Sequence, residues 1–146
     1  MIRLRGPDAT AAFGVGIASL LQPGDVVALY GDLGAGKTTL ARGIIEGLGH
    51  KGEVASPTFP IVQAYEELSL PVWHVDLYRI EKPEEIEELA LDEALEEGVL
   101  LIEWPERLGD RLWPHALRLV LRREGEGARA LTAELPPAWG GRWPPR

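Results

Sequence analysis

One short segment of the chain carries residue types whose spacing matches a phosphate-binding loop. It reads GDLGAGKTT from Gly31 to Thr39 and satisfies the Walker A pattern G-x-x-x-x-G-K-[ST] in full. Glycines allow a tight backbone bend whose N–H groups point at phosphate oxygens, because no Cβ stands in the way. Lys37 then supplies a point charge for the β and γ phosphates, and the Thr38 hydroxyl is suited to Mg²⁺. The segment therefore predicts that the chain binds a nucleoside triphosphate.

Two strand-like segments end in a carboxylate, and either acid suits the metal ion of such a site. VLLIE at 99–103 has four apolar residues before its acid, whereas VWHVD at 72–76 is interrupted by a histidine. Phosphate-loop proteins need a carboxylate at the end of a neighbouring buried strand to hold Mg²⁺ directly or through water. We expect Glu103 to lie near the metal and Asp76 to orient water. The opposite assignment stays open, as does a capping or solvent-facing role for either acid.

Two further features near these strands each allow two interpretations. SPTF at 56–59 lies between the loop's helix and the next strand, where many such proteins carry a segment that responds to the nucleotide. An ordinary turn whose hydroxyls satisfy backbone groups fits that segment equally well. Trp104 directly follows Glu103 at the end of a strand-like segment, and ligands bind at such strand ends in open α/β sheets. Trp104 is either an aromatic residue of the core or a contact for a partner.

The elements that would position these residues follow from the hydrophobic pattern. The apolar run Val26–Tyr30 directly before the loop suits a parallel strand buried on both faces, and a helical pattern follows the loop up to Leu48-Gly49. A turn at Gly6-Pro7 and a cap at Asp8 predict a helix over 9–21. Pro83 suits the first position of another helix. Further strands are expected at 2–5, 60–65, 72–76, 99–103, 117–121 and 128–133.

The order of these elements predicts the fold class. Alternating strands and helices followed by a late antiparallel hairpin indicate a single α/β phosphate-loop domain with three layers and a mixed sheet. We expect this domain to span residues 1–135. Residues 136–146 are rich in Pro and Trp and are expected to form an irregular tail.

Composition narrows the class of protein further. The 146 residues, 45% hydrophobic and 26% charged, suit one globular domain, and no apolar run approaches the roughly 18 residues that a membrane span needs. No secretion signal is recognisable in MIRLRGPD, and the absence of cysteine excludes thiol chemistry and fits the cytoplasm. The net charge is −8 and the densest charged block is acidic, so direct binding of nucleic acid is not expected. The three scattered histidines lack the spacing of metal ligands.

Four motifs in series resemble the TsaE family, also called YjeE, which comprises small bacterial ATPases of the tRNA threonylcarbamoyladenosine pathway. The motifs are GDLGAGKTT at 31–39, SPTF at 56–59, HVDLYRI at 74–80 and IEWPERL at 102–108. The resemblance covers residues 8–133 and does not extend to the tail.

This resemblance implies a set of site residues, with ATP and Mg²⁺ as the cofactors. It implies catalytic roles for Lys37, Asp76 and Glu103, and metal binding by Thr38 and Glu103. Thr10 and Arg129 match the family by weaker local similarity. The nucleotide-binding residues implied are Thr10, Asp32, Leu33, Gly34, Ala35, Gly36, Lys37, Thr38, Thr39, Thr58 and Arg129.

The resemblance also implies partners. TsaD and TsaB, together with TsaE, transfer a threonylcarbamoyl group to adenosine 37 of tRNA, and TsaE is expected to hydrolyse ATP and reset the complex. We expect slow hydrolysis by the chain alone, stimulation by its partners, and contact with tRNA only through them. No membrane partner is expected. Arg42, Arg79 and Arg107 are possible internal arginine fingers, although no motif demands that role. Two rival functions are a nucleotide-gated binding module with negligible hydrolysis and a small-molecule kinase.

Overall fold

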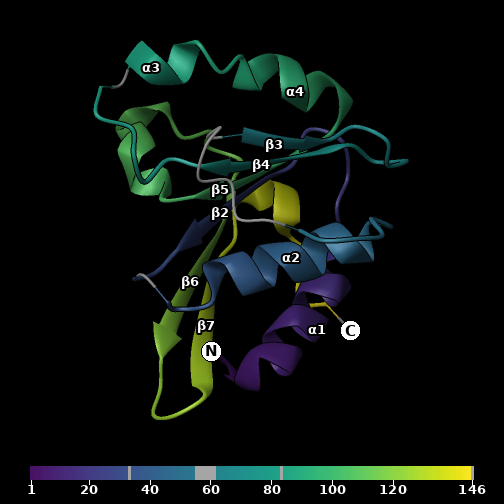
Figure 1. The fold of residues 1–146 in the computed structure, drawn as a ribbon, viewed down its shortest axis with the longest axis vertical. Coiled ribbons are helices and arrows are strands. Elements are labelled where there is room, and N and C mark those ends of the chain that lie inside the picture. The colour runs from purple at the N-terminus through teal and green to yellow at the C-terminus, as the bar shows by residue number, and fades with distance from the viewer. Residues whose placement is uncertain (33, 55–61, 83, 146) are drawn as a thin grey trace.

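A seven-stranded mixed sheet with helices on both faces forms the protein in the computed structural model (Figure 1). The structure describes residues 1–32, 34–54, 62–82 and 84–145. The strands are β1 Ile2–Arg5, β2 Val26–Tyr30, β3 Val62–Tyr65, β4 Val72–Asp76, β5 Val99–Glu103, β6 Leu117–Arg123 and β7 Ala128–Glu134. The helices are α1 Gly6–Ala18, α2 Lys37–Gly47, α3 Glu84–Glu87 and α4 Leu91–Glu97, with 3₁₀ segments η1 Pro105–Arg111 and η2 Pro137–Trp139.

The strands run in the order β1-β7-β6-β2-β5-β4-β3, and β2 lies at the centre. It pairs in parallel with β5 and β6, and β5 pairs in parallel with β4. The outer pairs β3–β4, β6–β7 and β7–β1 are antiparallel. The predicted fold class, an α/β domain with a mixed sheet and a late hairpin, is confirmed.

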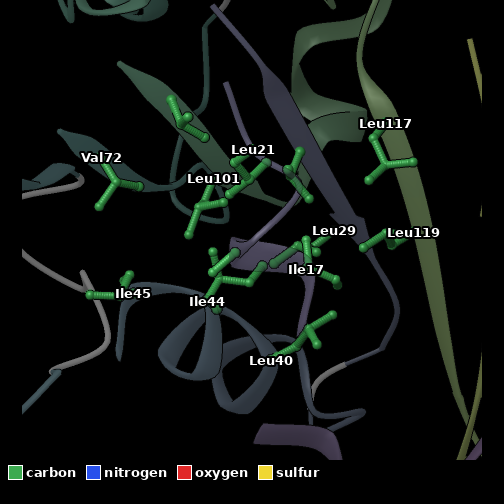
Figure 2. Packing of buried hydrophobic residues seen from close by; sticks show 14 of the residues in the cluster. Ile17, Leu21, Leu29, Leu40, Ile44, Ile45, Val72, Leu101, Leu117 and Leu119 are labelled. Atoms are coloured by element: carbon green, nitrogen blue, oxygen red, sulfur yellow. The ribbon is translucent and has the colours of Figure 1, made fainter. Parts of the chain in front are cut away.

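Successive side chains of the central strands point to opposite faces of the sheet, and this divides the core into two layers. Val27 and Leu29 of β2 pack against α1 and α2, as Figure 2 shows for Leu29 beside Leu40 and Ile44. Val26 and Ala28 of the same strand face the opposite layer, where α3, α4 and η1 pack. Because both faces of β2 are covered, its sequence is apolar throughout and not alternating.

Close packing of α1 on α2 depends on glycine. A Cβ on Gly14 would stand 2.5 Å from the carbonyl oxygen of Leu40, and one on Gly43 would collide with the carbonyl of Ala11. The two helix backbones therefore approach more closely than side chains would allow. This contact supports α2, whose N-terminus follows the phosphate-binding loop.

The structure corrects the expected start and end of α1. The helix begins at Gly6 with Arg5 as its N-cap, so Gly6-Pro7 forms its first turn and not a separate loop. Asp8 lies within that turn and makes no cap hydrogen bond, although its charge suits the positive end of the helix. The helix ends at Ala18, three residues before the expected boundary. Pro83 and residues 60–61 lie outside the described residues.

The C-terminal segment packs against the core. Trp139 is fully buried in the cluster that contains α1 and α2, and Trp143 contacts Phe13 edge to face at 5.7 Å. Arg142 forms an ion pair with Asp25, the residue before β2. Short 3₁₀ structure at η2 is the one helical element in this otherwise irregular segment as far as residue 145. Among the described residues, no helix has both the length and the apolar character that crossing a bilayer requires.

Candidate nucleotide site

The loop between β2 and α2 has the backbone that its glycines predict. Gly31, Gly34 and Gly36 all have positive φ values, 148°, 77° and 105°. Gly36 is the N-cap residue of α2, and Lys37 is the first residue of that helix. A helix N-terminus offers unpaired N–H groups and a positive dipole end to an anion, so this loop and helix suit a phosphate group. Leu33 lies outside the described residues.

The Lys37 side chain is almost fully buried at the base of this loop. Its ammonium group donates a hydrogen bond to the Gly31 carbonyl and lies 3.5 Å from the centroid of the Trp104 ring. Burial lowers the pKa of Lys37, and the nearby Glu103 carboxylate opposes that shift. The contacts with Gly31 and Trp104 are to neutral groups, so a phosphate oxygen would be a stronger partner for this cation.

Glu103 lies next to the first turn of α2. The Thr38 hydroxyl is 3.0 Å from Oε1 and 3.2 Å from Oε2 of this carboxylate, and His74 Nε2 is 2.7 Å from Oε2. A hydroxyl and a carboxylate are the hard oxygen donors that Mg²⁺ prefers. Mg²⁺ in nucleotide sites needs only one or two protein oxygens beside phosphate and water, and the Thr38–Glu103 pair fits that requirement.

Asp76 lies beside Glu103 at the same edge of the sheet. The two acids end the adjacent parallel strands β4 and β5 and are directly in register. Burial raises the pKa of Asp76, the N–H of Tyr78 lowers it by donating to Oδ1 at 3.0 Å, and the charge of Glu103 raises it further. Asp76 thus combines a more basic carboxylate than usual with a position next to the expected metal ligand.

Thr10 and Arg129 come together on the other side of the loop. With Gly36 and Thr39 they line a hollow of about 150 Å³ between the start of α1 and the start of α2, and its remaining lining residues are Gly6, Pro7 and Gly127. Arg129 donates to the Gly34 carbonyl at 3.1 Å, and its Nε is buried without a hydrogen-bond partner among the described residues. The Thr10 hydroxyl donates to the Gly6 carbonyl at 3.3 Å.

The remaining predicted residues lie at the rim of the site or outside the described part. Asp32 and Gly34 are exposed, and Ala35 is buried beneath the loop. Thr58 lies in the undescribed segment 55–61, so its position stays a prediction.

Sequence reasoning missed two side chains that contact the site residues. His74 reaches Glu103, and its signal was its position two residues before Asp76, which puts both on one face of β4. Arg123 packs against Gly34, where its guanidinium occupies the space that a Cβ would need. Only the register of the β6–β7 hairpin, which pairs Arg123 with Arg129, reveals that Arg123 lies near the site.

Comparison with known proteins identifies the family of this chain. A family model described as threonylcarbamoyl adenosine biosynthesis protein TsaE matches residues 4–131. The chain belongs to the TsaE family. The resemblance drawn from the four motifs is confirmed, and the match begins close to the N-terminus and ends in β7.

Individual TsaE proteins match most of the chain. The tRNA threonylcarbamoyladenosine biosynthesis protein TsaE of Bacillus subtilis is 43% identical over 131 residues, which cover 89% of this chain and 82% of that protein. The protein of the same name from Streptomyces coelicolor is 46% identical over 110 residues, 73% of this chain and 74% of its own. The crystal structure of Bacillus subtilis YdiB superposes with a TM-score of 0.78 at 36% identity, covering 92% of this chain and 83% of YdiB.

Proposed function

We propose that this TsaE-family protein is a Mg²⁺-dependent ATPase that acts with TsaD and TsaB in forming threonylcarbamoyladenosine in tRNA. The observation that carries the proposal is the grouping of Lys37, Thr38 and Glu103 at the N-terminus of α2, next to a glycine-rich loop. These are the residue types that bind the phosphates and metal of a nucleoside triphosphate. The pathway is the one for which the similar TsaE proteins of Bacillus subtilis and Streptomyces coelicolor are named.

Each site residue has a distinct task in this proposal. Lys37 leaves the Gly31 carbonyl and binds the β and γ phosphates, while the N–H groups at the start of α2 bind the same oxygens. Thr38 and Glu103 would hold Mg²⁺, which when bound would supply positive charge to balance the charge that develops on the transferred phosphoryl group. The hollow beside Thr10 and Arg129 receives the nucleoside part, because it adjoins Thr39 just beyond the phosphate-binding residues.

Asp76 is the residue best suited to orient the attacking water. It lies beside Glu103, and its raised pKa gives it more affinity for the water's proton than an exposed aspartate has. A water must still be aligned and a cation placed on the developing charge for rapid hydrolysis. Arg42 and Arg79 are exposed, and Arg107 donates to the carbonyl of Tyr78. We therefore expect slow hydrolysis by the protein alone.

The charge of the chain favours a protein partner over direct binding of tRNA. The net charge is −8, and the segment 81–97 carries acids along α3 and α4. The carboxylates of such a surface repel the phosphates of a nucleic acid backbone. Proteins that bind nucleic acid directly normally neutralise these phosphates with Lys and Arg. Contact with tRNA is therefore expected to pass through TsaD and TsaB.

ATP hydrolysis by the purified protein, with and without TsaD–TsaB, tests the proposal. Stimulation by the partners that disappears in Lys37→Ala is the expected result, and Lys51→Ala, an exposed lysine outside the site, serves as the matched control. Hydrolysis that the partners leave unchanged would contradict the partner-dependent part. Tight ATP binding without hydrolysis in either condition would instead identify a nucleotide-gated binding module.

A further inference from the structure

His74 is a fully buried histidine whose ring reaches the metal-binding edge of the sheet. It lies at the centre of β4, and its Nε2 is 2.7 Å from Oε2 of Glu103. An ionised carboxylate only accepts hydrogen bonds, so the proton of this contact belongs to Nε2 and His74 is the donor. The contact is a charge-assisted hydrogen bond between a fully buried and an almost fully buried side chain.

Strand geometry explains why this contact forms. Alternation along β4 puts His74 on the same face as Asp76, and Asp76 is in register with Glu103 of β5. His74 is therefore the diagonal neighbour of Glu103, one step deeper in the sheet and under the first turn of α2. From that position it holds Oε2 from below, while Thr38 contacts the carboxylate from the helix.

The remaining contacts of His74 show that this hydrogen bond is its single polar attachment among the described residues. Its Nδ1 is buried and has no partner there, and its neighbours Val72 and Leu101 are apolar. Gln63 of β3 is in register with His74 but forms no hydrogen bond with its ring. A histidine that served only to fill the core would be replaceable by an apolar side chain of similar volume, without an unpaired nitrogen. The contact with the Glu103 carboxylate explains why a polar ring lies at this depth in the core.

We propose that His74 is a positioning residue that fixes the orientation of the Glu103 carboxylate and holds it against Thr38, the residue with which it would bind Mg²⁺. The inference rests on the proposed function, because Glu103 has this task only if the site binds Mg²⁺ and ATP. Groups that orient metal ligands from behind change metal affinity by about 10- to 100-fold when they are replaced. His74 acts through Glu103 and touches neither the nucleotide nor the metal.

Titrations of Mg²⁺ and ATP on a set of variants test this role. His74→Leu removes the donor at similar volume, and His74→Gln keeps an N–H donor near the position of Nε2. Val72→Ala, on the same face of β4 but away from the acids, reports the effect of a simple packing defect. For each variant the thermal midpoint, the ATP affinity in EDTA and the Mg²⁺ concentration that half-saturates ATP binding are measured.

In His74→Leu we expect the Mg²⁺ requirement to rise about 10- to 100-fold while ATP affinity in EDTA stays unchanged. His74→Gln restores most of the Mg²⁺ affinity, and Val72→Ala changes the thermal midpoint alone. A folded His74→Leu with the original Mg²⁺ requirement overturns the proposal, and so does equal impairment of the Leu and Gln variants. If His74→Leu does not fold, His74→Asn replaces it, since its shorter amide stays polar but ends before Oε2.

Two results separate this role from the proposed function itself. If the unmodified protein shows no Mg²⁺-dependent ATP binding, both the function and the role of His74 are wrong. If it binds Mg²⁺ and ATP but His74→Leu is unaffected, only the positioning role is wrong. In the nucleotide-free protein, NMR is expected to show a slowly exchanging His74 Nε2 proton that exchanges rapidly in Glu103→Ala, and rapid exchange in both overturns the proposal.

Discussion

Buried charged groups lie at both ends of β2, and they are partnered in opposite ways. At the amino end, the Asp25 carboxylate accepts from the N–H of Gln22 and from the guanidinium of Arg142. Arg142 also donates to the Leu20 carbonyl and lies 3.9 Å from the centroid of the Trp139 ring. At this end each charge has an opposite charge as its direct partner.

At the carboxyl end neither buried charge has a Lys, Arg, Asp or Glu side chain as its direct partner within the described part of the chain. Lys37 contacts a carbonyl and an aromatic ring, and Glu103 contacts a hydroxyl and an imidazole. Separating a buried ion pair is costly, whereas a neutral partner is displaced more easily by a charged ligand. The comparison teaches that the Asp25–Arg142 pair stabilises the fold by joining the C-terminal segment to the start of β2. The contacts of Lys37, in contrast, can be exchanged for phosphate.

Replacing Lys37 tests the carboxyl end and has the largest expected effect. In Lys37→Met we expect kcat/KM for ATP hydrolysis to fall about 10²- to 10³-fold, because a cation aimed at the phosphates is removed. The thermal midpoint should not decrease, because the cost of burying the ammonium outweighs its attraction to Glu103 and its direct contacts are with neutral groups. Steady-state kinetics and thermal unfolding measure the two effects, and a large loss of stability would break the comparison.

Replacing Arg142 tests the amino end. In Arg142→Met we expect a loss of about 3 kcal/mol in the free energy of unfolding, because Asp25 is left as a buried charge without its counterion. ATP hydrolysis per folded molecule should be unchanged. Urea unfolding with the exposed Arg118→Met as control measures this, and Asp25→Asn added to Arg142→Met should recover part of the loss. An equal loss in the control would contradict the structural role.

Replacing Thr10 tests whether the hollow beside Gly36 belongs to the ligand-binding site at the carboxyl end of β2. Thr10→Val keeps the shape of this buried side chain but removes the hydroxyl that lines the hollow beside Gly36. One lost neutral hydrogen bond is worth about 1 kcal/mol, so ATP affinity should fall about fivefold. Calorimetric titration with ATP measures the change. Unchanged affinity would place the nucleoside elsewhere.

Replacing Asp76 gives the smallest effect on stability and depends on pH. Because burial raises the pKa of Asp76, the folded state binds its proton more tightly than the unfolded state does, and the ionised form destabilises the fold above that pKa. Asp76→Asn should therefore be slightly more stable than the original protein near pH 7. This difference should shrink as the pH falls through the raised pKa and Asp76 becomes protonated in both states.

Urea unfolding of both proteins at about pH 7 and about pH 4 measures this difference. A variant that is less stable at neutral pH would show that Asp76 is stabilised by its neighbours and that burial is not the dominant influence. The amino-end pair offers the contrast, because Asp25 is matched by Arg142 and its replacement should destabilise the fold.

Several features of the fold were predictable because they depend on local pattern. The apolar run before the loop, the glycines and the helical pattern after it predicted β2, the loop and α2. Short apolar runs that end in an acid, one of them interrupted by His74, were also sufficient to predict the strands that end at Asp76 and Glu103. The start of α1 was not predictable in this way, because the Arg5 cap uses no side-chain hydrogen bond that a motif could reveal.

The sequence by itself determined the chemistry of this protein, and the tertiary structure decided which residues share it. Glycine spacing, Lys37 and Thr38 define a phosphate-binding loop wherever it folds, since those residue types act through their own backbone and charge. The contact of His74 with Glu103 depends on the register of β4 and β5, and that of Arg142 with Asp25 joins residues 117 positions apart. Such pairings follow from packing over the whole chain, which local sequence does not encode.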